Sequence, residues 1–159
     1  MFISNGFELI KSLNTGQILT GLDLGDKTIG IAISDNRLII GSPFKTIKRK
    51  GGTTDTKILN SLFKEYDVGG IILGWPINLD GSENNRTRKT RDFGEKLYNE
   101  TNLGIYLQDE RYSSDIVFKG MNKNISKKKI KKYIDKSAAA YILQGFLDKF
   151  SNRNHFTNK

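Results

Sequence analysis

The sequence predicts an α/β domain in which a mixed five-stranded sheet carries helices on both faces. Three short apolar segments come first, and segments with helix and strand patterns alternate after them. Strands joined by tight turns pair antiparallel, whereas strands separated by helices pair parallel, so the two halves together indicate a mixed sheet. With 159 residues, the chain is long enough for one such domain around a single core.

The first part of the sheet is predicted from a hairpin pattern. Residues Ile18 to Leu24 and Thr28 to Ser34 are rich in apolar and β-branched side chains, and Gly25-Asp26-Lys27 between them has the composition of a tight turn. We expect a third strand at Leu38 to Ile40, because Gly41-Ser42-Pro43 breaks the pattern.

The second part alternates helices with strands. Helical spacing of apolar residues predicts helices at Thr53 to Tyr66, at Thr90 to Thr101 and at Ala138 to Leu147. The run Val68 to Leu73 is apolar throughout, as in strands of parallel sheets that are buried on both faces. A further strand is predicted at Gly104 to Gln108.

The ends of the chain differ from this central part. Residues 1–17 form an N-terminal extension whose apolar residues recur at helical spacing, residues 18–150 form the domain, and residues 151–159 form a polar tail. The single histidine, His155, lies in that tail, where catalysis is not expected. Proton transfer and metal binding would then depend on carboxylates, lysines or metal-bound water.

Composition narrows the cellular setting and the class of partner. The chain has no cysteine, which excludes disulfides and thiolate chemistry and fits a reducing compartment. No apolar run of about 18 residues is present, and the first residues lack the order of a signal peptide, so we expect a cytoplasmic protein without a membrane partner. The formal charge of +9 favours nucleic acid as the partner, with solubility alone as the alternative explanation.

Asp23 is the first candidate for chemistry, because it lies midway along an apolar strand. A charge in such a place is costly to bury without a partner. Gly21 and Gly25 stand two residues away on the same strand face, and we expect them to leave open space above the carboxylate for a metal ion or a phosphate. The alternative is an aspartate at a turn, facing solvent.

Asp109 and Glu110 close a later strand, at the kind of sheet edge where α/β proteins bind ligands. Adjacent strand residues face opposite ways, so one of the two is expected to enter a shared site while Arg111 pairs with the other. An ordinary salt-bridged strand end is the alternative.

Asp135 precedes the small residues Ala138 and Ala139 at the start of the last predicted helix. Taken alone, it is explained as well by helix capping as by chemistry. Three acids from separated segments together fit ligation of a hard cation, Mg²⁺ or Mn²⁺, better than three independent coincidences. A pair of such ions about 3.5 to 4 Å apart activates a water and stabilises a leaving oxygen.

Basic residues supply a candidate track for a nucleic-acid backbone. One group lies at the start of the helix after Gly-Trp-Pro, namely Arg86, Arg88, Lys89 and Arg91. A second group precedes Asp135 and consists of Lys123, Lys127, Lys128, Lys129, Lys131 and Lys132. Such charges bind phosphate rather than read bases, and an ordinary solvated face is the alternative for the lysine run.

Four ordered motifs resemble the YqgF/RuvX family. They are the segments Gly21 to Asp35, Gly74-Trp75-Pro76 with Gly81 beyond it, Asp109 to Ser114, and Asp135 to Gln144. The likeness runs from about Ile18 to Phe150. The first motif is shared with other ribonuclease H-like proteins, but the four in order are specific to this family, although Trp75 departs from its usual pattern.

The resemblance implies a ribonuclease H-like fold and a nuclease that matures the 5′ end of the small-subunit ribosomal RNA precursor, with kinship to Holliday junction resolvases. Carried over by position, the metal-binding acids are Asp23, Asp135, and either Glu110 or Asp109. The partner would be structured precursor RNA, or branched DNA for a resolvase. Whether the protein is a monomer or a homodimer stays open at this point.

Two other classes of function compete with a nuclease. A phosphotransferase of the actin and sugar-kinase class opens with a similar strand and hairpin, but it needs two such lobes and this chain has room for one. A non-catalytic RNA-binding assembly factor would use the lysines alone and keep the acids for structure.

Overall fold

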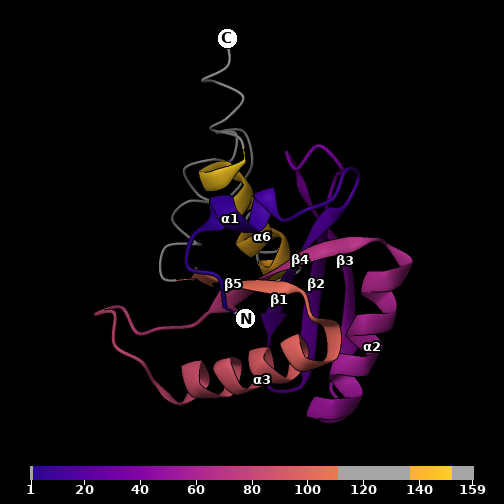
Figure 1. Ribbon diagram of the computed structural model, residues 1–159. Coiled ribbons are helices and arrows are strands. Elements are labelled where there is room, and N and C mark those ends of the chain that lie inside the picture. The colour runs from indigo at the N-terminus through magenta and orange to yellow at the C-terminus, as the bar shows by residue number, and fades with distance from the viewer. Residues whose placement is uncertain (1, 111–136, 152–159) are drawn as a thin grey trace, which may run out of the picture.

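The computed structural model describes residues 2–110 and 137–151. Within these ranges the elements are α1 (Gly6–Lys11), β1 (Ile18–Leu24), β2 (Thr28–Ser34), β3 (Gly41–Lys48), α2 (Gly52–Glu65), β4 (Val68–Trp75), α3 (Asn85–Thr101), β5 (Gly104–Asp109) and α6 (Ala138–Phe150). The strands form one five-stranded sheet with helices on both faces, as Figure 1 shows, and the predicted architecture is confirmed.

The sheet is mixed, in the order β3-β2-β1-β4-β5. The first three strands form an antiparallel meander, and its first turn closes with a hydrogen bond from the Gly25 amide to the Thr28 carbonyl oxygen. Strands β4 and β5 continue the sheet in parallel on the other side of β1. The central position of β1 places Asp23 between an antiparallel and a parallel neighbour.

The two faces of the sheet carry separate cores. On one face α1 and α6 cover a cluster that includes Leu9, Leu19, Ile72, Leu143 and Phe146. On the other face α2 and α3 cover a cluster that includes Leu22, Ile31, Leu59, Leu73, Phe93 and Leu97. Alternation along each strand sends successive side chains to the two cores in turn. None of the helices in the described ranges is long and apolar enough to cross a membrane.

The third strand lies later in the chain than expected. Residues Leu38 to Ile40 belong to a turn in which Leu38 has φ 59°, and the strand begins at Gly41 and includes Pro43. Because β3 is an edge strand bonded only to β2, it tolerates a residue without a backbone N–H, and the register shifts next to Pro43. The Gly-Ser-Pro sequence was therefore wrongly interpreted as the end of a strand.

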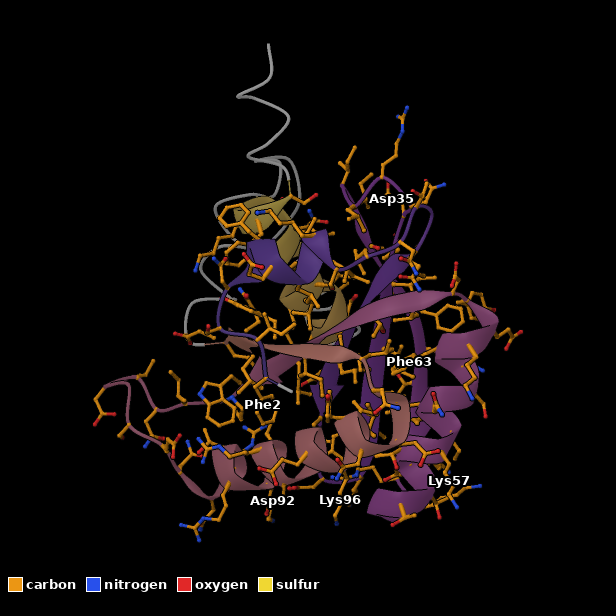
Figure 2. All side chains as sticks on the ribbon, in the orientation of Figure 1. Phe2, Asp35, Lys57, Phe63, Asp92 and Lys96 are labelled. Carbon is orange, nitrogen blue, oxygen red and sulfur yellow. The ribbon has the colours of Figure 1, made fainter. Side chains whose placement is uncertain are left out.

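The helix in the N-terminal segment covers only Gly6–Lys11. The residues before it extend the sheet instead, since the Ile3 amide donates to the Ile105 carbonyl oxygen at 2.7 Å and Phe2 bridges to Ile105. The Phe2 ring packs towards α3, where a Cβ on Gly94 would lie 2.7 Å from it; Figure 2 shows the ring between β5 and that helix.

Helix α3 begins five residues before the predicted Thr90. Asn84 caps it, accepting a hydrogen bond from the Thr87 amide at 3.0 Å, while the Thr87 hydroxyl accepts one from the Asn84 amide at 2.8 Å. This reciprocal cap stabilises a first turn that has almost no apolar residue to signal it. The earlier start matters for function because it places Arg86 in the first turn of the helix.

Candidate active site

Asp23 lies on the α6 face of the sheet, in a row of residues that crosses four strands. Its neighbour on β2 is Gly30, which in turn pairs with Thr46 on β3. On the other side, Gly74 of β4 follows Leu73, the partner of Leu22. The half-buried carboxylate therefore has a glycine on each side within the sheet.

The glycines along the Asp23 strand do not leave the open space that we expected. A Cβ on Gly21 would lie 2.6 Å from the Ala139 carbonyl oxygen and 2.7 Å from the Leu143 Cβ, so α6 fills that space. A Cβ on Gly25 would lie 3.0 Å from the Thr28 carbonyl oxygen. Gly21 thus permits close approach of the last helix. The open space beside Asp23 lies sideways, towards Gly30, where a Cβ would meet Ala139 and Asp23 at 3.6 Å.

Glu110 reaches the same face from the end of β5. Its amide donates to the Trp75 carbonyl oxygen at 3.3 Å, which holds the chain against the end of β4. Its carboxylate lies directly over Gly74, where the Cβ of a larger residue would collide with Oε1 of Glu110 and would come within 2.6 Å of Ile142. Two carboxylates from separate strands therefore flank one glycine.

Asp109 leaves the sheet on the other face. Gln108 faces α6, because its amide nitrogen lies 3.1 Å from the position of a Cβ on Gly145, and alternation then directs Asp109 away from α6. Asp109 and Glu110 therefore point to opposite faces of the sheet, as alternation predicts, and Glu110 is the one that shares a face with Asp23. Asp109 still acts on the Glu110 carboxyl through its charge.

The electrostatics of the two carboxyls reflect this crowding. Burial raises the pKa of Asp23, and the positive charge of Arg86 opposes that rise. The pKa of Glu110 is raised to about 7, chiefly by burial and secondly by the negative charge of Asp23. The charge of Arg86 lowers this pKa, and the charge of Asp109 raises it. The two groups cannot both be ionised at neutral pH without repulsion, and a bound cation would relieve this repulsion.

Arg86 stands next to the pair, while the other basic residues of α3 have different surroundings. Together with Glu110 and residues 76–79, 84 and 85 it lines a cavity of about 600 Å³. Arg88 and Lys89 are exposed on the helix, as Arg86 is, but neither of them lines this cavity. Arg91 forms an ion pair with Glu83 and lies 5.1 Å from the centre of the Trp75 ring, so its charge is already partly compensated.

Several predicted site residues lie outside the described ranges. They are Arg111, Lys123, Lys127, Lys128, Lys129, Lys131, Lys132 and Asp135. Among residues 2–110 and 137–151 no group of three or more Asp, Glu or His side chains could hold a metal ion. The described part of the site is therefore a pair of carboxylates with one arginine.

Comparison with known proteins decides the family. The family model described as "RuvX: Holliday junction resolvase" matches residues 17–149. The chain belongs to the RuvX family. Among its relatives, a protein of Paramagnetospirillum magneticum named "Putative pre-16S rRNA nuclease" is 42% identical over 94% of this chain and 95% of its own. A protein of the same name from Ruegeria pomeroyi is 40% identical, over 91% and 95%.

Solved structures place this RuvX chain in the ribonuclease H-like fold. RuvC of Thermus thermophilus in complex with a Holliday junction substrate superposes with a TM-score of 0.56, covering 87% of this chain and 96% of that one at 9% identity. Another structure of Thermus thermophilus RuvC gives a TM-score of 0.53 over 87% and 97%, also at 9% identity. At so low an identity, the likeness concerns the fold alone.

Sequence reasoning did not single out three features of the RuvX site. Gly74 was interpreted as the end of a strand, although a glycine at the carboxyl end of a buried strand is also a signal for close approach. Ser137 was noted only within a motif, and the residue is buried in the structure. Thr46 lies in a strand that the sequence placed elsewhere, so its position beside Gly30 was not expected.

Proposed function

We propose that this RuvX chain is a metal-dependent nuclease that processes the 5′ end of precursor 16S ribosomal RNA in the cytoplasm. The single observation that carries the proposal is the meeting of Asp23 and Glu110 over Gly74. The names of relatives about 40% identical over nearly the whole chain support the RNA substrate.

The carboxylate pair suits a hard divalent cation. Mg²⁺ and Mn²⁺ prefer oxygen ligands, and the mutual repulsion of the two half-buried carboxyls favours the binding of positive charge between them. Asp23 and Glu110 would hold the metal, with Asp135 proposed from the sequence as a third ligand. We propose two ions, because phosphodiester hydrolysis commonly uses a pair.

The side chains of this protein would have separate roles around the scissile phosphodiester. Divalent ions held by Asp23 and Glu110 would supply an activated water and would stabilise the leaving oxygen. Asp23 and Glu110 must lose their protons to act as ligands, and the Arg86 charge assists this by lowering both pKa values. Arg86 also lines the cavity beside Glu110, where a guanidinium would bind a phosphate oxygen of the substrate.

Hydrogen bonds within the loop after β4 fix the wall of the cavity that Arg86 and Glu110 line. Asn84 donates to the Pro76 carbonyl oxygen at 2.9 Å and to the Asn78 side chain at 2.8 Å. Asp80 accepts hydrogen bonds from the amide and the hydroxyl of Ser82 at 2.9 and 2.6 Å. These contacts hold the cavity wall in place before a substrate binds, which is what a preorganised site requires.

The proposal is tested with labelled precursor RNA that spans the 5′ end of the 16S sequence, incubated with Mg²⁺ or with chelator. Asp23→Asn should retain the fold and RNA binding but lose Mg²⁺-dependent cleavage. Asp92→Asn is the matched control, because it removes the same charge from an exposed position on α3, labelled in Figure 2. If Asp23→Asn cuts as fast as the parent, the assignment is wrong.

Cleavage of branched DNA is the second candidate, favoured by the description of the family model. A four-way DNA junction in the same assay separates it from RNA processing. A resolvase must nick two strands together, which calls for a dimer, so the mass of the complex on the junction is measured as well. Binding of either substrate without any cleavage would instead support a non-catalytic assembly factor.

A further inference from the structure

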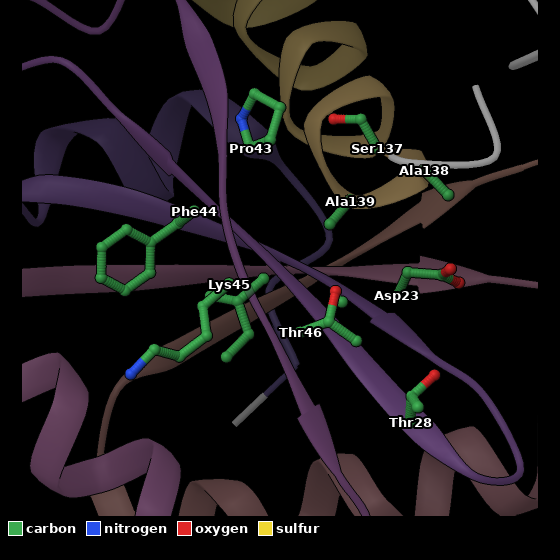
Figure 3. A pocket seen from close by; sticks show the side chains of 11 residues that line it. Asp23, Thr28, Pro43, Phe44, Lys45, Thr46, Ser137, Ala138 and Ala139 are labelled. Carbon is green, nitrogen blue, oxygen red and sulfur yellow. The ribbon is translucent and has the colours of Figure 1, made fainter. Parts of the chain in front are cut away.

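A groove runs sideways from Asp23 across the α6 face of the sheet. It encloses about 350 Å³ between the edge of the sheet and the start of α6, and Figure 3 shows Asp23 at one side of it. The lining includes Asp23, Thr28, Gly30, Thr46, Ser137 and Ala139. The cavity beside Arg86 lies on the other side of the carboxylate pair, so the two hollows flank Asp23 and Glu110.

Ser137 at the wall of the groove has a side-chain oxygen for which the described residues provide no hydrogen-bond partner. The residue is 4% exposed, and its Oγ is buried without a hydrogen-bond partner among the described residues. Ser137 is the N-cap residue of α6, yet its hydroxyl makes no capping hydrogen bond. A buried hydroxyl without a partner is costly, which indicates a ligand that completes it.

The rest of the lining suits a phosphate group. Thr28 and Thr46 contribute further hydroxyls from β2 and β3, and Figure 3 shows both threonines on the same side of the sheet as Asp23. The first turn of α6 contains no acidic residue and begins with three alanines, so a ligand could approach its amides closely. Hydroxyls and helix N-termini are common donors to phosphodiester oxygens in complexes with nucleic acids.

We infer that this groove is a subsite for a backbone phosphodiester next to the scissile one, held by the hydroxyls of Ser137 and Thr46. The inference rests on the proposed nuclease function for its substrate class. Thr46 is two strands away from Asp23, on the order of 10 Å at about 4.8 Å per strand. A substrate strand that crosses the sheet from Glu110 over Asp23 would therefore bring its next phosphate over Gly30.

Removing the Ser137 hydroxyl provides the first test. Affinities of the full-length parent and Ser137→Ala are measured by fluorescence anisotropy, in chelator, for an RNA hairpin from the precursor 5′ end and a DNA hairpin of the same sequence. The variant should bind both about tenfold more weakly, since a hydrogen bond to a charged phosphate oxygen is lost in each. Its melting temperature should equal or exceed that of the parent, because none of the described residues forms a hydrogen bond with this hydroxyl that the substitution would break.

A change of charge at Thr46 provides a second test that does not depend on a buried position. Thr46 is exposed, so Thr46→Glu and Thr46→Gln should both fold. The Glu variant should bind RNA and DNA at least tenfold more weakly than the Gln variant, because its carboxylate would face the phosphate. Ser61→Glu and Ser61→Gln, at an exposed position on α2 on the opposite face, measure the effect of net charge alone.

The results separate the subsite from the proposed function. Unchanged affinity in Ser137→Ala, a loss confined to RNA, or equal binding by the two Thr46 variants would overturn the phosphate subsite. A marked fall in the melting temperature of Ser137→Ala would do the same, since the hydroxyl would then serve the fold. Weaker binding of both hairpins by these variants, with a parent that cuts neither in Mg²⁺, would support the subsite and refute the nuclease.

Discussion

The Glu110 carboxylate occupies the space over Gly74 that a Cβ at position 74 would need. The absence of a side chain on β4 thus decides where an acidic group from the end of β5 comes to lie. Because Asp23 lies on the other side of Gly74, the same glycine sets how closely the two carboxyls approach. A glycine that takes no part in chemistry thereby becomes a determinant of the site.

Gly74→Ala should abolish cleavage while the protein still folds. The new methyl group would push Glu110 away and would also crowd Ile142, at a cost of about 1 to 3 kcal/mol in unfolding free energy. Gly30→Ala is the control for stability, since its Cβ would meet Asp23 and Ala139 at an ordinary 3.6 Å. Thermal melting and Mn²⁺ affinity by calorimetry check both variants; undiminished Mn²⁺ binding by Gly74→Ala would contradict the prediction.

Stability in chelator should fall as the pH rises from about 4.5 to about 7. The pKa of Glu110 is raised from 4.5 to about 7 in the folded protein, so the folded state binds more protons than the unfolded state in this interval. The loss amounts to at most about 3 kcal/mol. Urea unfolding at a series of pH values measures it, and Glu110→Gln should flatten the curve, whereas Glu95→Gln should leave it unchanged.

Saturating Mg²⁺ should reverse this pH dependence, because the metal ion that we propose would bind only the deprotonated carboxylates. The same unfolding series in Mg²⁺ should show stability rising towards neutral pH in the parent and no such gain in Glu110→Gln. Equal curves with and without Mg²⁺ would mean that the carboxylate pair does not bind the ion.

Arg86→Gln should shift the activity profile to higher pH. The Arg86 charge lowers the pKa of both Asp23 and Glu110, so its removal leaves the pair protonated until the solution is more alkaline. The pH of half-maximal cleavage at fixed Mg²⁺ is the measurement. Arg88→Gln, an exposed site on the same helix, controls for the loss of one positive charge; an identical shift in both variants would indicate a general charge effect.

Glu83→Gln should strengthen RNA binding and steepen its dependence on salt. Arg91 is paired with Glu83 and lies over the Trp75 ring, and release from the carboxylate would let it neutralise a phosphate. The slope of log affinity against log salt should grow by about one. Glu95→Gln, on α3 like Arg91, removes an equal charge without breaking the Arg91–Glu83 ion pair, so it should change the slope less.

Replacing Lys127, Lys128 and Lys129 together by alanine should weaken RNA binding and flatten its salt dependence. This prediction rests on the sequence, in which these lysines precede Asp135. Binding in a series of salt concentrations tests it. An unchanged slope would mean that the run does not contact the backbone of the nucleic acid.

The sequence predicted the fold well where local pattern and tertiary environment agree. The β1–β2 hairpin and the buried β4 strand follow from residue types alone, and the structure confirms both. It failed at β3 because position at the sheet edge, which makes Pro43 acceptable, is a property of the whole sheet. It also missed the start of α3, where a side-chain cap replaces the apolar signal.

The site was predictable only in part for the same reason. An aspartate within an apolar strand attracts notice in any sequence, and Asp23 was found in this way. The alternation rule separates Asp109 from Glu110, but only the strand order shows which of the two faces Asp23. The unpartnered hydroxyl of Ser137 and the place of Thr46 depend on contacts between segments about ninety residues apart, which no local pattern records.

Close packing of α6 against Gly21 has a consequence for the order of events during synthesis. The ribosome releases the sheet strands well before the last helix, and domains begin to fold from the N-terminal side. Until α6 emerges, the face that carries Asp23 and Glu110 stays open to water, and neither group is desolvated. The nuclease centre that we propose would therefore form only after α6 has emerged, so a nascent chain that still lacks this helix should not cut nucleic acid.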